Sequence, residues 1–495
     1  MLGIAAGTIA LLLLFASRNG YHRDELYFLA ASHHLSFGYV DQPPMAVVAA
    51  WLARVALGNT LLGLRLIPAL LDGVVVALTG AIARELGGRR FAQAFAALCV
   101  GLGGFLVIAH VEGPTIFDAV DWALTSFLII RILRTGNARL WLAVGAVVAV
   151  GLESKETILL LLATLAIGLV VNRQASIFRS SWLWAGVGLA VAGWAPNLAW
   201  QAIHHWPARE MDANLRAEHS GLRFALTYPF ITLLALQPLV APVWMAGWWA
   251  LWTRIEMRPF RAFATSFAIA FVLLWIVIPD RFYYLAPGYP VLFAAGAIVT
   301  QEVVNGERGF FRRVPHRRFF WRSRHAAVAI ACLGGVLILP LALPVLPPAA
   351  LAKVPLQAIN YNLGEEIGWQ TLTDQVAGVW KALPPSERAS SVIVTENYGE
   401  AGAIDLFGPT RGLPQAYSGH NSFWWWGPPS PATGAAIAVG FDRAALTPYF
   451  TSVSLADRIH NAYGVTNDEE GAPIWICTRQ LASWSAIWLA FRHYG

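Results

Sequence analysis

A cluster of charged residues follows the first apolar segment of the chain directly. Residues 2–16 carry no charge, and Arg23, Asp24 and Glu25 come shortly after them. A carboxylate at the water–lipid boundary is poorly solvated, and such a group suits general-base work on a hydroxyl. The alternative, which the residues alone leave open, is an interfacial ion pair between Arg23 and Asp24.

Two further acids and one lysine also lie at the ends of apolar segments. Asp118 and Asp121 lie one turn apart at the start of a later apolar segment, where the helix dipole alone would also favour an acid. Lys155 is the one lysine before residue 349, and Glu153 and Glu156 flank it. An anionic partner such as a phosphate would explain Lys155, and a local ion pair with its neighbours is the alternative.

The composition is typical of a membrane protein. Of the 495 residues, 57% are hydrophobic and 13% are charged, and the mean hydropathy is +0.54. A soluble protein averages about 25% charged residues. A net charge of +6 therefore reports arginine placement in loops and does not indicate a nucleic-acid partner.

Apolar runs of membrane-spanning length predict about eleven transmembrane helices. We expect them at residues 1–17, 61–83, 91–109, 115–133, 139–153, 156–172, 182–203, 224–252, 262–279, 285–303 and 326–347. Residues 43–57 are too short to span and should lie at the interface. Alternate loops, including residues 308–324, are rich in arginine. The positive-inside rule therefore predicts a cytoplasmic amino terminus and a carboxy-terminal part outside the cytoplasm.

The chain divides by composition into residues 1–348 and 349–495. The first part is the predicted transmembrane module. In the second, "SSVIVTENYGEAGAIDLFG" indicates a strand, a turn and a helix, and "AAIAVGF" and "PIWICTRQ" indicate further strands. This alternation predicts a small extracytoplasmic α/β domain with a largely parallel sheet. "SGHNSFWWWGPPSPATG" is an aromatic loop that could bind a sugar or anchor the domain at the membrane interface.

Four motifs resemble the GT-C fold glycosyltransferases that use polyprenyl- or dolichyl-phosphate sugars. This superfamily includes protein O-mannosyltransferases and aminoarabinose transferases. The motifs, all expected on the outer membrane face, are "YHRDELYFLAASHHLSFGYVDQPPM", "FDAVDWALTSF", "GLESKETILLLL" and "RFYYLAPGYPVL". The resemblance implies an enzyme that transfers a hexose or pentose from a polyprenyl phosphate to a hydroxyl on a lipid, glycan or protein, with inversion, at the outer face of the inner membrane.

The resemblance also implies roles for individual residues. Asp24 would be the general base, and Asp121, with Asp118 as the alternate, would be the second catalytic acid. The donor phosphate would contact Lys155, Arg281 and Tyr284. Glu25 and Asp41 would support the site. The chain departs from the aminoarabinose branch at Tyr27 and Gln42, where that branch often carries cations.

No cofactor is required by these motifs. Asp41 with His204 or His205 could hold a divalent metal, although no tight histidine spacing favours it. The sequence has no phosphate-loop or dinucleotide fingerprint. A multi-span lipid or solute transporter is the alternative function. Transporters place polar residues near the midplane of repeated halves, whereas here the polar residues gather towards one membrane face.

Overall fold

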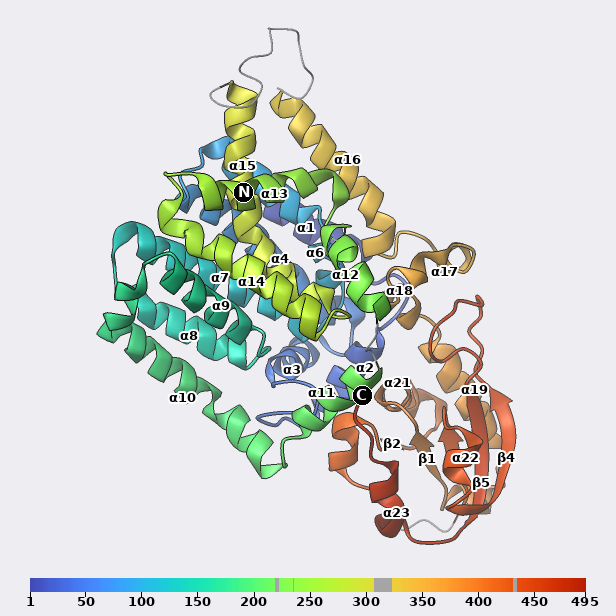
Figure 1. The fold of residues 1–495 in the computed structure, drawn as a ribbon. Helices are drawn as coiled ribbons and strands as arrows, with labels where there is room; N and C mark the ends of the chain where they lie inside the picture. Colours follow the sequence, from blue (N-terminus) through green and yellow to red (C-terminus); the bar gives the residue numbers. More distant parts are fainter. Residues whose placement is uncertain (219–221, 235, 307–322, 431–433) are drawn as a thin grey trace. The chain divides into compact units, whose positions relative to one another are not determined.

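The computed structural model describes residues 1–218, 222–234, 236–306, 323–430 and 434–495 (Figure 1). Contacts within the chain define two compact units. The first unit comprises Met1–Ala16, Arg65–Trp200 and Arg216–Leu343, and the second comprises Ser17–Leu64, Gln201–Leu215 and Pro344–Gly495. The arginine-rich residues 307–322 lie outside the described part of the chain.

The first unit is helical. Its elements are α1 (Leu2–Phe15), α4 (Leu61–Glu85), α5 (Arg90–Gly101), α6 (Phe105–His110), α7 (Pro114–Thr135), α8 (Leu140–Leu152), α9 (Ile158–Val171), α10 (Ser181–Ile203), α12 (Leu222–Leu234), α13 (Ala241–Thr253), α14 (Arg261–Val277), α15 (Tyr289–Asn305) and α16 (Arg324–Ala342). A helix lies within each of the predicted spans. Four apolar segments in the described chain are long enough to cross a membrane, at Leu61–Glu85, Arg258–Val277, Phe282–Asn305 and Arg324–Ala342. Shorter apolar helices accompany them, and the polytopic fold class is confirmed.

Many large apolar side chains of this unit are exposed. Trp184, Val191, Trp249, Val336 and Leu337 are each between 54% and 63% exposed. In water such a surface would cost free energy, whereas in a bilayer it faces lipid. The exposed side chains therefore agree with a membrane location for these helices.

Two predicted spans are wrong as single helices. Residues 91–109 break between α5 and α6, and residues 224–252 break between α12 and α13. Gln237 sits at the second break with φ of 116°, outside the helical region. Its Nε2 donates to the carbonyl of Leu102 at 3.3 Å and to that of Ala331 at 2.7 Å. Backbone groups freed inside a membrane need such partners, so a side chain at the second break supplies one to a carbonyl at the first.

Small residues let the helices of the first unit approach closely. A Cβ atom on Gly247 of α13 would collide with the Leu292 carbonyl of α15, and one on Gly296 would collide with the Val243 carbonyl. A Cβ on Gly168 of α9 would lie 2.5 Å from the Ala262 carbonyl of α14. Glycine at these positions allows the backbone-to-backbone packing that is common between membrane helices.

The second unit combines helices with one sheet. Its helices are α2 (Arg23–Ala31), α3 (Met45–Leu57), α11 (Pro207–Glu218), α17 (Pro348–Leu351), α18 (Asn362–Glu365), α19 (Trp369–Ala382), α20 (Pro385–Arg388), α21 (Tyr398–Phe407), α22 (Arg443–Leu446) and α23 (Trp484–Phe491). Its strands are β1 (Val392–Thr395), β2 (Ala416–Ser418), β3 (Ala436–Val439), β4 (Phe450–Arg458) and β5 (Pro473–Gln480).

The sheet has the order β2-β1-β3-β5-β4 and is mixed. β1 pairs in parallel with β2 and β3, while β5 pairs antiparallel with β3 and β4. The expectation of a largely parallel sheet is therefore wrong. β4 leads into β5 through residues 459–472 without a helix, and such a direct return makes strands antiparallel. One side of the sheet packs on α23, through a core that includes Val394, Ala438 and Trp488.

The two compact units differ from the predicted domains, because α2 and α3 belong to the same unit as the carboxy-terminal residues. α2 lies against α21 (Figure 1). Gly402 faces the backbone of Leu26, so that a Cβ there would come within 2.8 Å of its carbonyl. That residues 349–495 form a domain of their own stays a prediction.

Candidate active site

The charged cluster near the amino terminus forms the first turn of α2. His22 is the N-cap, and its backbone N–H donates to Glu25 Oε2 at 2.8 Å. In return, His22 Nδ1 accepts the backbone N–H of Asp24 at 3.1 Å. These two bonds satisfy donors that a helix start leaves unpaired. The structure thus places Glu25, predicted as a supporting residue, in the cap that fixes the backbone under Asp24.

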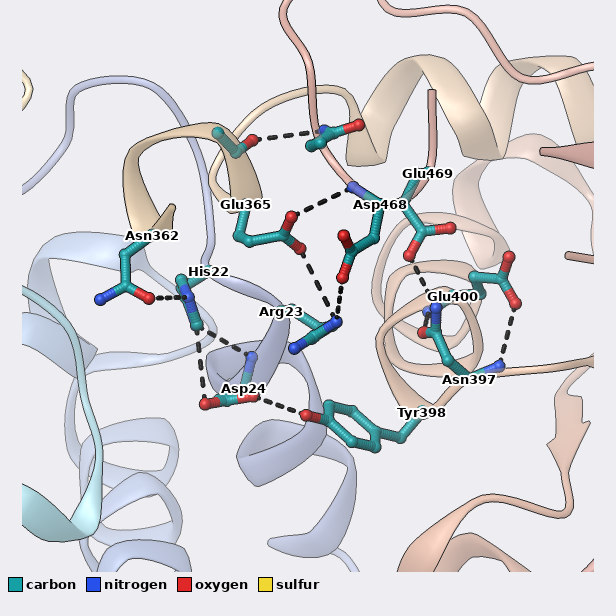
Figure 2. Close-up of polar contacts among 12 residues, drawn as sticks. His22, Arg23, Asp24, Asn362, Glu365, Asn397, Tyr398, Glu400, Asp468 and Glu469 are labelled. Carbon is teal, nitrogen blue, oxygen red and sulfur yellow. Dashed lines mark hydrogen bonds and ion pairs between the residues drawn. The ribbon is translucent and has the colours of Figure 1, made fainter. Parts of the chain in front are cut away.

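The orientation of His22 follows from its partners. Since Nδ1 accepts the N–H of Asp24, the ring proton belongs on Nε2, which lies 3.2 Å from the Asn362 Oδ1 that can accept it. Asn362 comes from α18, far along the chain. The His22 ring is therefore fixed between α2 and α18 (Figure 2).

Among the described residues, the Asp24 carboxylate accepts a hydrogen bond at one of its two oxygens. Its Oδ1 accepts the hydroxyl of Tyr398 at 2.8 Å, and Tyr398 is the first residue of α21. Its Oδ2 lies 3.9 Å from His22 Nδ1, beyond hydrogen-bond range. The Asp24 side chain is 41% exposed. One oxygen is thus oriented by the Tyr398 hydroxyl, while the other has only the longer contact to His22 (Figure 2).

Arg23 forms its ion pairs with acids other than its neighbour Asp24. Its guanidinium makes an ion pair with Asp468 at 2.8 Å and lies 4.0 Å from Glu365. The same group lies over the ring of Tyr398, 5.6 Å from its centroid. An ion pair between Arg23 and Asp24, the alternative that the sequence left open, is not among the salt bridges of the described residues. Burial lowers the pKa of Arg23, but the surrounding acids and Tyr398 outweigh it and raise the pKa.

Asp41 has a tyrosine of its own. The hydroxyl of Tyr27 donates to Asp41 Oδ1 at 2.7 Å. Burial raises the pKa of Asp41 to about 7, against the opposing effect of that hydrogen bond. The rings of Tyr27 and Tyr398 are in contact, with centroids 4.9 Å apart. The two carboxylates are thus each bonded to one of two adjoining tyrosines.

The aromatic loop continues this cluster. The ring of Tyr27 lies 6.4 Å from that of Trp426, which stacks on His34 at 4.3 Å. Phe423 packs against Trp426 at 4.3 Å. Within the second unit, the loop therefore packs against α2 and the segment after it.

The three predicted phosphate contacts lie together in the first unit. Lys155 Nζ lies over the ring of Tyr284, 4.3 Å from its centroid, and donates to Thr115 Oγ1 at 3.2 Å. The Tyr284 hydroxyl accepts a hydrogen bond from Arg281 at 2.6 Å. In the described chain, no carboxylate of Glu153 or Glu156 forms a salt bridge with Lys155. The local ion pair is therefore absent from this geometry.

Asp118 and Asp121 are buried on α7, with exposed fractions of 1% and 6%. Asp121 packs on Gly151, where a Cβ would lie 3.2 Å from the Asp121 Cβ. Neither oxygen of Asp118 has a hydrogen-bond partner among the described residues, and neither does Asp121 Oδ2. Both acids keep acceptor capacity, so the geometry does not choose between them.

The candidate metal ligands are engaged elsewhere. Asp41 binds Tyr27, and the ring of His204 packs edge-on against Trp425 at 4.7 Å. His205 adopts a positive φ of 62° at the end of α10. Across the described residues, no group of three histidine, cysteine or acidic side chains could hold a metal ion. No arrangement seen there favours metal chemistry at Asp41.

Sequence reasoning missed Tyr398. This residue lies 374 positions from Asp24, and only the folded unit joins them. A partial signal was present in "NYGEAG", where Asn397 and Glu400 form a capping box and two glycines lie three residues apart. That pattern predicts a helix start with a face open to close packing, without naming its partner.

Comparisons with known proteins agree with this architecture. Residues 41–200 match the model of the dolichyl-phosphate-mannose-protein mannosyltransferase family. ArnT from Cupriavidus metallidurans bound to undecaprenyl phosphate shares the fold with a TM-score of 0.58 at 14% identity, covering 96% of this chain and 97% of that one. The apo state of the same protein gives a TM-score of 0.55 at 15% identity, covering 94% and 96%. A search of curated proteins finds no significant match. The chain therefore shares the fold of ArnT over nearly its whole length, and part of it resembles the dolichyl-phosphate-mannose-protein mannosyltransferase family.

Proposed function

We propose that this protein is a membrane glycosyltransferase that moves a sugar from a polyprenyl phosphate to an acceptor hydroxyl, with Asp24 as the general base. The observation that carries the proposal is the state of Asp24. One carboxylate oxygen is anchored by Tyr398 at 2.8 Å, and the side chain is 41% exposed. A base needs this combination of fixed orientation and access to its proton donor.

The chemistry needs few groups from the protein. The leaving group is a phosphate monoester whose second pKa is about 6, so it departs without a general acid. The bond from the anomeric carbon to the phosphate oxygen breaks as positive charge develops on the sugar. The acceptor oxygen forms a bond to that carbon from the opposite face, and its proton passes to Asp24 Oδ2. The products are an inverted glycoside and a polyprenyl phosphate.

Cations must compensate the phosphate charge. We assign this role to Lys155, with Arg281 and Tyr284 beside it, because the ammonium of Lys155 has three donors and retains donor capacity beyond its bond to Thr115, although the Asp118 carboxylate also attracts it. Asp121, or Asp118 in its place, is the second acid of the proposed site. Both are buried with unused acceptor oxygens. The donor class is supported by the ArnT structure, which was solved with undecaprenyl phosphate.

The proposal includes an orientation. The arginine-rich loops should face the cytoplasm, so that α2 and the carboxy-terminal residues lie at the outer face of the inner membrane. A membrane-dissolved donor and an aqueous acceptor meet at that boundary. The acceptor is a lipid, glycan or protein hydroxyl.

The test is donor consumption by the full chain in proteoliposomes. A panel of radiolabelled undecaprenyl-phosphate hexoses and pentoses is supplied together with a membrane extract as the source of acceptors. We expect one donor to be converted into undecaprenyl phosphate and an inverted glycoside. If labelled donor crosses the bilayer but is recovered unchanged, the protein is a transporter and the proposal fails.

A further inference from the structure

A tyrosine from the carboxy-terminal part of the chain reaches the proposed base. The hydroxyl of Tyr398 lies 2.8 Å from Asp24 Oδ1, and only the hydroxyl can be the donor to a carboxylate (Figure 2). Burial, followed by the nearby Asp24 charge, raises the pKa of Tyr398 well above its ordinary value. Tyr398 therefore keeps its proton and remains a donor at any pH at which the protein works.

The ring of Tyr398 has little freedom. It lies between the ring of Tyr27 at 4.9 Å and that of His420 at 4.6 Å, and the guanidinium of Arg23 lies over it at 5.6 Å. His420 is itself fixed through Nε2, which lies 2.7 Å from the Gly495 carbonyl. A hydroxyl on a ring packed in this way has one place to point.

The backbone under Tyr398 is fixed as well. Asn397 caps α21 by accepting the Glu400 N–H at 3.0 Å, and the Asn397 N–H donates to Glu400 Oε2 at 3.1 Å. Asn397 Nδ2 donates to Glu469 at 2.7 Å. At Gly399 a Cβ would lie 2.5 Å from Arg23 Cγ, so the helix start sits directly on the first turn of α2.

The position of Asp24 makes this contact consequential. The His22 cap fixes the Asp24 backbone, but a carboxylate at the second position of a helix can still rotate about its side-chain bonds. In the described geometry the Tyr398 bond is the one hydrogen bond to the Asp24 carboxylate. That bond selects which oxygen faces inward and which faces the acceptor.

We propose that Tyr398 is the positioning residue of the base, whose hydroxyl holds Asp24 Oδ1 and so presents Oδ2 to the acceptor hydroxyl. The proposal rests on the proposed function and deepens it. The carboxy-terminal residues then complete the site chemically, through α21, instead of only covering it. Tyr398 does not touch the reacting atoms in this account.

The test compares Tyr398→Phe with the wild-type full chain, using the panel donor that the wild type consumes. Phenylalanine keeps the ring contacts and removes only the hydroxyl. A hydrogen bond to a charged group contributes roughly 10- to 100-fold, and water can partly replace it at an exposed carboxylate. We therefore expect kcat to fall on the order of 10-fold, with the KM for the donor changed less than about two-fold.

A second readout separates positioning from stability. Loss of positioning should lower kcat without a matching rise in the donor KM or a matching fall in melting temperature. Tyr463→Phe is the matched control, because Tyr463 belongs to the same unit and is 52% exposed. In an Asp24→Asn background, Tyr398→Phe should cause no further loss of the residual rate.

The outcomes are distinguishable. If the wild type consumes donor and Asp24→Asn does not, but Tyr398→Phe keeps the wild-type kcat, the positioning role is refuted and the proposed function stands. If Tyr398→Phe loses activity only in proportion to a lowered melting temperature, and causes the same loss in the Asp24→Asn background, Tyr398 is structural and the inference is again refuted. If no panel donor is consumed by the wild type, the proposed function itself fails.

Discussion

Gly402→Ala should disturb the site without touching it. A Cβ at this position of α21 would lie 2.8 Å from both the carbonyl carbon and the oxygen of Leu26 in α2. Ordinary contact begins at 3.4 Å, so α21 must retreat by about 0.6 Å. The same movement would lengthen the 2.8 Å bond from Tyr398 to Asp24 to about 3.4 Å, outside the range of an O–H···O hydrogen bond.

The energy of this change can be isolated with a matched variant. Gly378 lies within α19 of the same unit, and a Cβ there would meet nothing within 4 Å. Both alanines gain the same helix propensity, up to about 1 kcal/mol. The difference between Gly402→Ala and Gly378→Ala therefore reports the overlap, and overpacking of this kind costs about 1–3 kcal/mol.

The assay is thermal unfolding in detergent, followed by donor turnover in proteoliposomes. Gly378→Ala should be at least as stable as the wild type and fully active. Gly402→Ala should be less stable than Gly378→Ala by the stated amount, and its kcat should fall as the Tyr398 bond weakens. Equal stability and equal kcat for the two variants would refute the packing of α21 on α2 as described.

Three further predictions concern separate parts of the molecule. Lys155→Ala should raise the KM for the lipid-linked donor roughly 10- to 100-fold and leave the KM for the acceptor unchanged, because a contact to phosphate contributes about 1.5–3 kcal/mol. Kinetics in reconstituted membranes measure both constants. An unchanged donor KM with an unchanged kcat would show that Lys155 is a structural residue. Burial raises the pKa of Glu400 and of Glu469, so the folded chain should retain a proton at pH values where the unfolded chain loses it. The resulting contribution to stability is fully present below pH 4.5, the ordinary pKa of glutamate. It is lost as pH rises through the raised pKa. Melting temperatures across pH should show this slope, and Glu400→Gln should flatten it; an equally steep slope would contradict the assignment. A cysteine introduced at the exposed Tyr463 should react with an impermeant reagent from outside the inner membrane, and labelling from the cytoplasmic side alone would reverse the topology.

The membrane fold could be predicted from the composition and from the length of the apolar segments, because a segment that crosses a bilayer must be apolar along its length. The breaks within two of the predicted spans, residues 91–109 and 224–252, were not predicted. Residues 224–252 carry no charge, and the break at Gln237 is supported by carbonyls of Leu102 and Ala331 that only the assembled helices supply. Local hydropathy does not encode such long-range partners.

Among the strands too, some were predicted from the sequence and others were missed. β1, β3 and β5 were predicted from their apolar residues, whereas β2 and β4 were missed. β4 lies at the edge of the sheet, and most of its side chains are exposed, so its sequence lacks an apolar alternation. The direction of pairing was wrong for β5 because direction depends on the connection and not on the strand itself.

The acids of the candidate site were predicted from the sequence, whereas the residues that orient them were missed. Asp24, Asp41 and Lys155 are unusual where they stand, since charges at the ends of apolar segments are costly, and that cost draws attention to them. Tyr27 and Tyr398 are aromatic residues in an aromatic-rich chain, and nothing local marks their hydroxyls. Their proposed role rests on the distances of 2.7 Å and 2.8 Å from their hydroxyls to the carboxylates.

The most direct test of the account is the turnover of Asp24→Asn beside that of Asp212→Asn. Asp212 is an exposed acid of the same unit, so its variant controls for the loss of a carboxylate. Asparagine keeps the shape of Asp24 and can still accept the Tyr398 bond, but it cannot take a proton. Both variants should insert and melt like the wild type. Since a general base contributes about 10²–10⁴-fold, Asp24→Asn should lose transfer of the lipid-linked sugar by that factor while Asp212→Asn retains it. Near-normal turnover of Asp24→Asn would contradict the central claim.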